Sequence, residues 1–257
     1  MPLWLAASAA YFGYVALLAL SGPGLTARAR LRALSLVGYG ALVMLVALRT
    51  RSPILHAWLL PPALLLLAYW ATGALFVSPM QKLERLLLSV DDRVGIRRLT
   101  ARTPPWLAAF FELAYAGVYP LIPIALILYI TSADRPDPAR FWAVILITDY
   151  ICFGTLPWFQ TRPPRSLEAD DPWRSAWRRF NVRVVTVASI RANTFPSGHA
   201  AEGLAAALLV LDAPTPWVVW MFFNAAAISA AAVFGRYHYA VDVVAGWIVA
   251  LVVWWIV

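Results

Sequence analysis

Long apolar stretches alternate along the chain with short polar segments that hold nearly all of the arginines. A helix rises about 1.5 Å per residue, so about 20 apolar residues are needed to cross the hydrocarbon core of a membrane. The pattern predicts crossings at 3–21, 33–48, 54–78, 106–132, 141–157, 198–213, 217–235 and 240–257. The blocks 33–48 and 198–213 are short, so six or seven crossings are the alternatives to the preferred count of eight.

Two longer polar connections, 79–105 and 158–197, carry amphipathic segments. The first contains an apolar stripe at helical spacing, formed by Leu83, Leu86, Leu87 and Val90. We expect a helix lying in the headgroup region, with Glu84 on its polar side. In the second, Asp170, Asp171 and Pro172 precede a Trp- and Arg-rich run, which predicts a helix start at the interface. A solvated charged loop is the alternative for each segment.

Composition agrees with this pattern and excludes other classes. The chain has 257 residues, of which 62% are hydrophobic and 13% are charged, against about a quarter charged in soluble domains. This excludes a soluble globular enzyme, a disordered tail and a disulfide scaffold. The single cysteine, Cys152, allows no intrachain disulfide and no thiolate metal site. A net charge of +8 in so apolar a chain indicates lipid headgroups rather than nucleic acid as partners.

The basic residues are distributed unevenly between the two sides of the predicted bundle. Connections 22–32, 79–105, 158–197 and 236–239 share one side and hold 17 of the 21 Lys and Arg residues. Cytoplasmic loops carry the excess of Lys and Arg in membrane proteins. The count therefore predicts that this side faces the cytoplasm.

The first candidate site is the segment 193–199, Asn-Thr-Phe-Pro-Ser-Gly-His, directly before an apolar helix. The small residues allow backbone N–H groups at the helix start to point at an anion. A helix N-terminus carries about half a positive charge, so phosphate is favoured there. His199 thus stands beside a predicted phosphate-binding helix end.

The second candidate is the segment 235–242, Gly-Arg-Tyr-His-Tyr-Ala-Val-Asp. His238 and Asp242 are four residues apart, so on a helix they share a face and can hydrogen-bond. A carboxylate on one imidazole nitrogen fixes the tautomer and leaves the other nitrogen free to attack.

A third candidate, 159–165, reads Phe-Gln-Thr-Arg-Pro-Pro-Arg. Arginine recognises phosphate in a bidentate manner, and the prolines restrict the backbone that carries it. No crossing separates Arg165 from His199, and two crossings separate His199 from His238. All three segments are therefore expected on one face of the membrane.

These motifs resemble the type 2 phosphatidic acid phosphatase superfamily. Its Pro-Ser-Gly-His signature stands intact at 196–199, and the His-x-x-x-Asp centre of its next signature stands at His238 and Asp242. The resemblance covers roughly 54–257, and implies a six-helix catalytic core preceded by about two transmembrane helices in 1–53. We therefore expect an all-α polytopic membrane helix bundle.

The resemblance also implies roles for these residues. His238 would be the nucleophile that forms a phospho-histidine, oriented by Asp242, and His199 would protonate the leaving alcohol and later activate water or an acceptor hydroxyl. The expected phosphate ligands are Arg165, Arg162, Ser197, Gly198 and Arg236. Members of this superfamily need no metal, so no cofactor is expected.

The chain departs from the longer family signatures at two positions. Thr155 replaces the lysine of the first signature, and the Pro-Pro-Arg run looks more like the branch related to inositol phosphorylceramide synthases, in which Arg165 rather than Arg162 is the phosphate ligand. Ala232 replaces the arginine expected six residues before the catalytic histidine, which leaves Arg236 as the nearest arginine.

Other polar residues have less defined roles. His56 has no partner pattern, so interfacial anchoring is the better interpretation. Glu112 and Asp149 fall inside apolar blocks, where structural pairing and a substrate role are both open. Glu202 follows His199 by three residues, which places it near the site.

The sequence as a whole predicts an integral protein of a bacterial cytoplasmic membrane that hydrolyses a phosphate monoester or diphosphate of a lipid. Its partners would be a phosphorylated lipid substrate and membrane lipids. Two alternatives remain: a lipid phosphotransferase that passes a phospho-head group to a lipid alcohol, and a non-catalytic lipid-binding or transport protein on the same fold.

Overall fold

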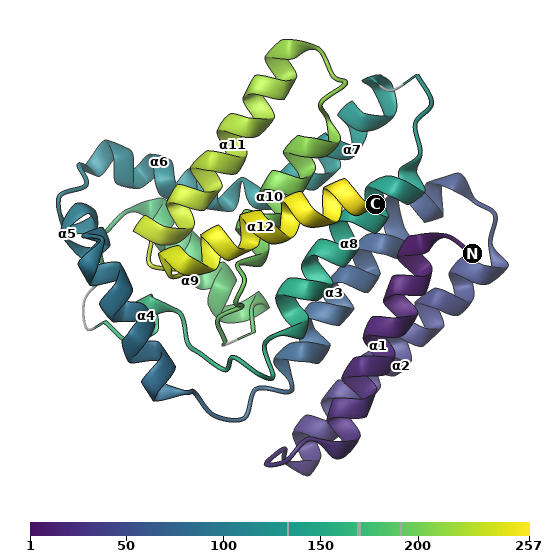
Figure 1. Ribbon diagram of the computed structural model, residues 1–257, viewed down its shortest axis with the longest axis horizontal. Helices are drawn as coiled ribbons and strands as arrows, with labels where there is room; N and C mark the ends of the chain where they lie inside the picture. The colour runs from purple at the N-terminus through teal and green to yellow at the C-terminus, as the bar shows by residue number, and fades with distance from the viewer. Residues whose placement is uncertain (133, 169–170, 191) are drawn as a thin grey trace.

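The computed structural model describes residues 1–132, 134–168, 171–190 and 192–257. Over these ranges the chain is helical and forms no strand (Figure 1). The helices are α1 (Leu3–Ser21), α2 (Ala27–Arg49), α3 (Leu60–Gly73), α4 (Gln81–Arg93), α5 (Ile96–Ala101), α6 (Pro105–Ala116), α7 (Val118–Ser132), α8 (Pro138–Gly154), α9 (Ala176–Ala188), α10 (Gly198–Leu209), α11 (Thr215–Phe234) and α12 (Ala240–Ile256). The expected all-α class is confirmed.

Among the described residues, four helical segments are long and apolar enough to cross a membrane: α1, α2, the segment Leu55–Gly73 and α11. A fifth span results if α6 and α7, which meet at a 57° bend, are counted as one. The protein is therefore an integral membrane protein, but the expected eight crossings are not all of full length. The helices α8 and α12 have 17 residues and α10 has 12, and 12 residues rise only about 18 Å.

The short helix α10 lies in the middle of the bundle and packs against α7, α8, α11 and α12 (Figure 1). Most of its residues are alanine, glycine or leucine and are buried. Small side chains allow neighbouring helices to approach closely without a large apolar core. The N-terminal pair α1 and α2 lies at one side of the bundle, where α1 packs on α8 and α2 packs on α3.

A π-helical turn, Leu55–Leu59, leads into α3. Pro61 has no N–H group, so it cannot donate to the carbonyl of Ala57 four residues earlier. The indole Nε1 of Trp142 on α8 donates to that carbonyl at 2.7 Å instead. The carbonyl that the proline leaves free thus links the start of α3 to α8. His56 bonds the Thr50 carbonyl at 3.1 Å through Nε2, which is a local structural contact.

The second helix starts six residues earlier than the apolar pattern predicted. Thr26 caps it by accepting from the N–H of Ala29 at 3.2 Å. The guanidinium of Arg30, counted in the sequence as part of a loop, donates to the carbonyls of Ala19 and Gly22 at the end of α1. Cations near a helix C-terminus satisfy its free carbonyls, so Arg30 joins the two helices.

The helix expected within 79–105 is present as α4, but its buried face differs from the prediction. Glu84, Leu87 and Asp91 point inward, whereas Leu86 is 57% exposed. Glu84 is only 3% exposed although the pattern placed it on the polar side. The carboxylates on this face form ion pairs with arginines of the loops that carry the candidate site residues. They are therefore buried together with their cationic partners.

The other expected interfacial helix begins later than predicted. Ser175, not Pro172, precedes the first turn of α9, and its hydroxyl accepts from the N–H of Arg178 at 2.9 Å. Asp170 lies outside the described residues, as does Arg191, one of the basic residues counted above in 158–197. Asp171 instead accepts from the Arg178 guanidinium at 2.8 Å.

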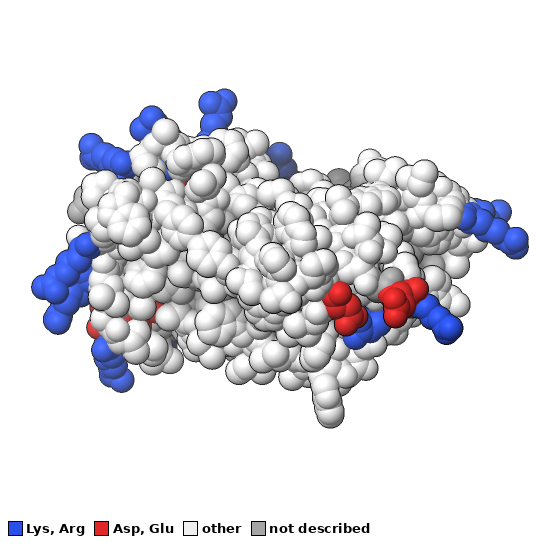
Figure 2. Space-filling model, turned by 90° about the horizontal axis from the view of Figure 1, so that it is seen from above, with Lys and Arg blue, Asp and Glu red and all other residues white. Residues whose placement is uncertain are grey.

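Figure 2 shows one face of the molecule, on which Lys and Arg side chains gather at the ends and margins. The broad area between them is largely uncharged, apart from two acidic side chains with basic neighbours at its lower right. Leucines on α1 and α2 such as Leu17, Leu20 and Leu42 are more than half exposed. Such a surface suits contact with lipid chains.

Candidate active site

The loop before α10 carries the first histidine. Ser197 caps the helix, with its hydroxyl accepting from the N–H of Ala200 at 3.4 Å. His199 is the second residue of α10 and is half-buried. The side chain of Ser197 is fully buried, and the cavity described below is lined by Gly198 and His199 rather than by Ser197. Ser197 therefore shapes the helix start.

The turn between α11 and α12 carries the second histidine. The N–H groups of Tyr237 and His238 both donate to the carbonyl of Ala232, each at 2.9 Å. Arg236 has a φ of 58°, in the left-handed region that few non-glycine residues adopt. This tight turn places His238 two residues before α12, with Asp242 in the first turn of that helix.

His238 Nδ1 lies 3.4 Å from Asp242 Oδ2, so the expected pair is present, but His238 stands in the turn before α12 and does not share a helix face with Asp242. Asp242 Oδ2 also accepts from the Asn193 side chain at 2.9 Å and from the backbone N–H of Tyr239 at 3.0 Å. These bonds fix the carboxylate from two directions. The carbonyl of Asp242 accepts from the N–H of Ser197 at 2.9 Å, so the two histidine-bearing segments are joined directly.

The imidazole rings of His199 and His238 are neighbours, with their centroids 6.1 Å apart and their planes tilted by 49°. His199 stacks on the ring of Tyr115 at 5.1 Å, and Tyr115 stacks on Tyr237 at 3.8 Å. Tyr119, just after the bend between α6 and α7, meets His199 edge-on, with the ring centroids 6.5 Å apart. Aromatic contacts of this kind restrict the orientation of the imidazole ring.

Arg165 lies in a short 3-10 turn, Pro164–Ser166, after α8. Its N–H donates to the carbonyl of Arg236 at 2.9 Å, and its guanidinium carbon lies 5.1 Å from the centre of the Tyr237 ring. The side chain lines the same cavity as both histidines. In the part of the chain that the structure describes, it is the single Lys or Arg of the cavity wall.

The structure does not bring Arg162 or Arg236 to the cavity, although the sequence placed both among the phosphate ligands. Arg162 donates to Glu84 at 2.9 Å. Arg236 is 1% exposed and is held by Asp91 and Glu168, each at 2.7 Å. Both guanidinium groups are thus neutralised by carboxylates, two of which lie on α4.

Glu112 is the centre of a buried polar network next to this cavity. It accepts from the Trp173 indole at 2.8 Å, from Arg178 at 3.2 Å and from Asn181 at 2.7 Å. The Tyr237 hydroxyl donates to it at 2.7 Å, and burial raises the pKa of this phenol, which keeps it protonated. Of the two roles left open for Glu112, structural pairing and substrate binding, these contacts support structural pairing.

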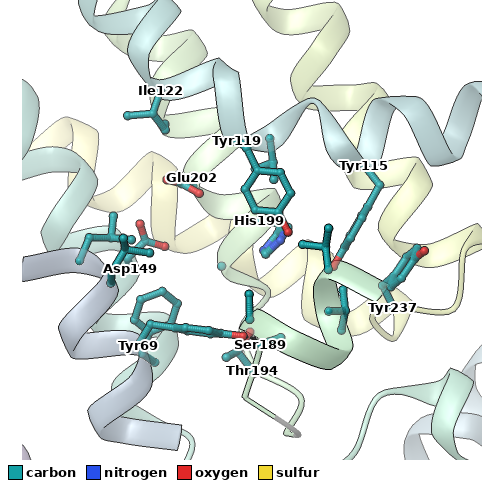
Figure 3. A pocket seen from close by; sticks show the side chains of 18 of the residues that line it. Tyr69, Tyr115, Tyr119, Ile122, Asp149, Ser189, Thr194, His199, Glu202 and Tyr237 are labelled. Carbon is teal, nitrogen blue, oxygen red and sulfur yellow. Dashed lines mark hydrogen bonds between the residues drawn. The ribbon is translucent and has the colours of Figure 1, made fainter. Parts of the chain in front are cut away.

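A cavity of about 360 Å³ joins these elements. At one end lie Arg165, His238 and Thr194, and at the other lie apolar side chains of α3 and α7 such as Leu65 and Leu126. Figure 3 shows His199 between the two ends, with Ile122 on one side and Thr194 on the other. The cavity thus has a cationic, imidazole-lined end and an apolar end, which fits an amphiphilic molecule.

The fold and this cavity define an integral membrane protein that encloses a polar site among its helices. The family model described as the PAP2 superfamily matches residues 82–256, about two thirds of the chain. The chain belongs to the PAP2 superfamily, which supports a phosphatase or phosphotransferase activity. No curated protein and no solved structure matched the chain.

Sequence reasoning missed several residues of this site. Asn193 stood inside the quoted motif, but its bond to Asp242 joins residues 49 positions apart. Tyr115, Tyr119 and Tyr237 were not singled out, although two of them interrupt an apolar block with hydroxyl groups. An aromatic residue in such a block is usually a packing residue, so no sequence signal separated them from the core.

Proposed function

We propose that the protein is a metal-independent lipid phosphatase that works through a phospho-histidine on His238. The observation that carries this proposal is the pair of neighbouring imidazoles of His199 and His238, 6.1 Å between centroids, in a cavity that also holds Arg165 and many apolar side chains. A phosphate held between the rings would meet a nucleophile on one side and a proton donor on the other.

In the proposed first step, Nε2 of His238 attacks phosphorus while the bond from phosphorus to the lipid oxygen breaks. His199 gives its proton to that leaving oxygen, so that a neutral alcohol departs. Asp242 accepts from Nδ1 of His238, which fixes the tautomer and stabilises the charge that develops on the ring. In the second step a water oxygen attacks phosphorus, its proton passes to His199, and the nitrogen–phosphorus bond breaks.

Charge on the phosphoryl oxygens has to be stabilised in both steps. Arg165 supplies a guanidinium that no described carboxylate contacts within salt-bridge distance. The first N–H groups of a helix have no intrahelical partner and favour anions. Gly198 and His199 provide these groups at the start of α10. Arg165 as the phosphate ligand also agrees with the resemblance to the inositol phosphorylceramide synthase-related branch.

The test is to incubate purified protein with phospholipid carrying labelled phosphate, with EDTA present. Free labelled phosphate is the expected product, and it should disappear in His238→Ala. A new phosphorylated lipid in place of free phosphate would show a phosphotransferase instead. Full phosphate release by His238→Ala would refute the phospho-histidine, and no turnover of any lipid by the wild type would favour a binding or transport protein.

We propose in addition that the site faces the cytoplasm of a bacterial cytoplasmic membrane. The distribution of 17 of 21 basic residues supports this orientation. Cys152 is buried and can be replaced, after which a single cysteine introduced in 79–105 reports the side. Labelling by an impermeant maleimide only after lysis is expected, and labelling of intact cells would reverse the assignment.

A further inference from the structure

Two carboxyl groups line the cavity and take no part in the chemistry proposed above. Asp149 comes from α8 and Glu202 from α10. Figure 3 shows Glu202 between Ile122 and His199, and Asp149 to the left of His199, above Tyr69. Neither is explained by the pairing that accounts for Glu112.

Asp149 is 1% exposed, and its Oδ2 atom has no hydrogen-bond partner among the described residues. A buried carboxylate oxygen without a donor is costly, by more than a lost ordinary hydrogen bond. Its Oδ1 atom lies 3.4 Å from the place where a Cβ on Gly198 would stand. The unpartnered carboxyl therefore sits beside the residue that begins α10, next to the proposed phosphate position.

Glu202 lies about one helical turn beyond His199 on α10, whereas Asp149 lies beside Gly198 at the start of that helix. One turn is about 5.4 Å, which matches the span from phosphorus to a substituent on the second carbon after the ester oxygen. Beyond the carboxyl groups the wall is apolar, with Leu126 and Trp142.

From this position we infer that Asp149 and Glu202 form a subsite for a hydrogen-bond donor on the lipid backbone next to the phosphate ester. A carboxylate repels the phosphate itself and accepts from a hydroxyl, an amide N–H or an ammonium group. The inference rests on the proposed phosphatase function and deepens it. The substrate class is then a phosphorylated lipid with such a donor, in preference to a fully acylated glycerol phosphate or a polyprenyl phosphate.

The test compares two lipids that differ by a single hydroxyl. One is 1-oleoyl lysophosphatidate, and the other is its 2-deoxy analogue, 1-oleoyl-propanediol 3-phosphate. We expect wild-type kcat/KM to be about ten- to hundredfold higher for the lipid with the hydroxyl, the range for losing a hydrogen bond to a charged group. A sphingoid base phosphate and a ceramide phosphate then rank the ammonium and amide donors against the hydroxyl.

Three variants connect this preference to the carboxyl groups. In Asp149→Leu and Glu202→Met the ratio of the two kcat/KM values should fall toward one, whereas the exposed Asp212→Asn should keep the wild-type ratio. The ratio is measured within each variant, so a partial loss of folded or active protein cancels. A variant that does not fold leaves the wild-type comparison decisive.

Failure of this inference can be told apart from failure of the proposed function. Equal turnover of both lipids by the wild type, or a preference that survives in both variants, would overturn the donor subsite and leave the phosphatase in place. Turnover of no phosphorylated lipid would overturn the phosphatase itself.

Discussion

The imidazole rings of His199 and His238 lie 6.1 Å apart although the residues belong to different helix ends. In the proposed mechanism the His238 ring attacks phosphorus and the His199 ring protonates the leaving group. Removing one ring should therefore affect the phosphoenzyme differently from removing the other. We expect His238→Ala to form no phosphoenzyme, whereas His199→Ala should accumulate phospho-histidine from a substrate with a good leaving group such as 4-nitrophenyl phosphate. Acid-labile label on the protein, measured after rapid quenching, checks this. Label retained by His238→Ala would contradict the assignment.

Asp242 Oδ2 accepts from Asn193 and Tyr239 as well as contacting His238. Asp242→Asn can place an amide N–H where the carboxylate accepted, which disturbs the tautomer of His238. We expect kcat to fall by about 10²-fold or more, with little change in KM. Asn193→Ala should show a smaller loss in kcat, because it removes one of the bonds that position the carboxylate. Unchanged kcat in Asp242→Asn would show that His238 acts without this partner.

Arg165 and Arg236 should differ in what their removal costs. Arg236→Met leaves the buried carboxylate of Asp91 without its cation, so the free energy of unfolding should fall by about 3–5 kcal/mol. Arg165→Met should leave the melting temperature in detergent nearly unchanged and lower kcat/KM by about 10²–10³-fold. Thermal unfolding and turnover of lysophosphatidate measure the two effects. If Arg165→Met lowered the melting temperature and Arg236→Met lowered only kcat/KM, the choice of Arg165 as the phosphate ligand would be refuted.

The pairing of Glu84 with Arg162 should make stability depend on pH. Hydrogen bonds from the Arg162 guanidinium lower the pKa of Glu84 below its ordinary value of 4.5. Because the folded pKa is the lower one, the stabilisation is fully present above the ordinary value and is lost as the pH falls through the folded pKa.

We therefore expect the difference in melting temperature between the wild type and Glu84→Gln to be constant near neutral pH and to narrow below about pH 4.5. The exposed Asp92→Asn on the same helix serves as the control and should show no such narrowing. A difference that stays constant into acid would show that the charge of Glu84 contributes nothing.

Gly246 on α12 permits the close contact that aligns the two histidine segments. A Cβ at this position would lie 2.6 Å from the carbonyl oxygen of Ser197, which belongs to the backbone and cannot move alone. Gly246→Ala should push α12 away from α10, lower kcat/KM by about tenfold or more, and destabilise the fold by about 1–3 kcal/mol. Gly13→Ala on α1, where a Cβ meets nothing within 4 Å, is the matched control and should have no effect on kcat/KM. Full activity of Gly246→Ala would show that this approach is not needed.

The histidine site could be predicted from the sequence because its signals are local. His238 and Asp242 are four residues apart, and His199 directly follows a glycine and a capping serine at the start of a helix. Each motif adjoins an apolar helix, so counting the helices between them placed all of them on one side. The contact between His199 and His238 agrees with that count.

Local spacing did not separate the three arginines, although the resemblance to the inositol phosphorylceramide synthase-related branch favoured Arg165 over Arg162. Arg162 and Arg236 are bound by Glu84 and Asp91, which lie 78 and 145 positions away in the sequence. In the sequence Glu84 looked like part of a solvated helix face. A carboxylate's partner is decided by which side of a helix meets which loop, and no local spacing reports that.

The sequence by itself determined the all-α membrane class and the approximate position of most apolar helices, and it singled out His199, His238 and Asp242, because hydropathy and short spacings act within one helix or at one helix end. Only the tertiary structure decided that Arg165 is the arginine at the cavity, that Ser197 shapes a helix start, and that Asp149 and Glu202 face the space beside His199. Those outcomes depend on contacts between helices far apart in the chain, where charge pairing and the close approach of small residues select one arrangement.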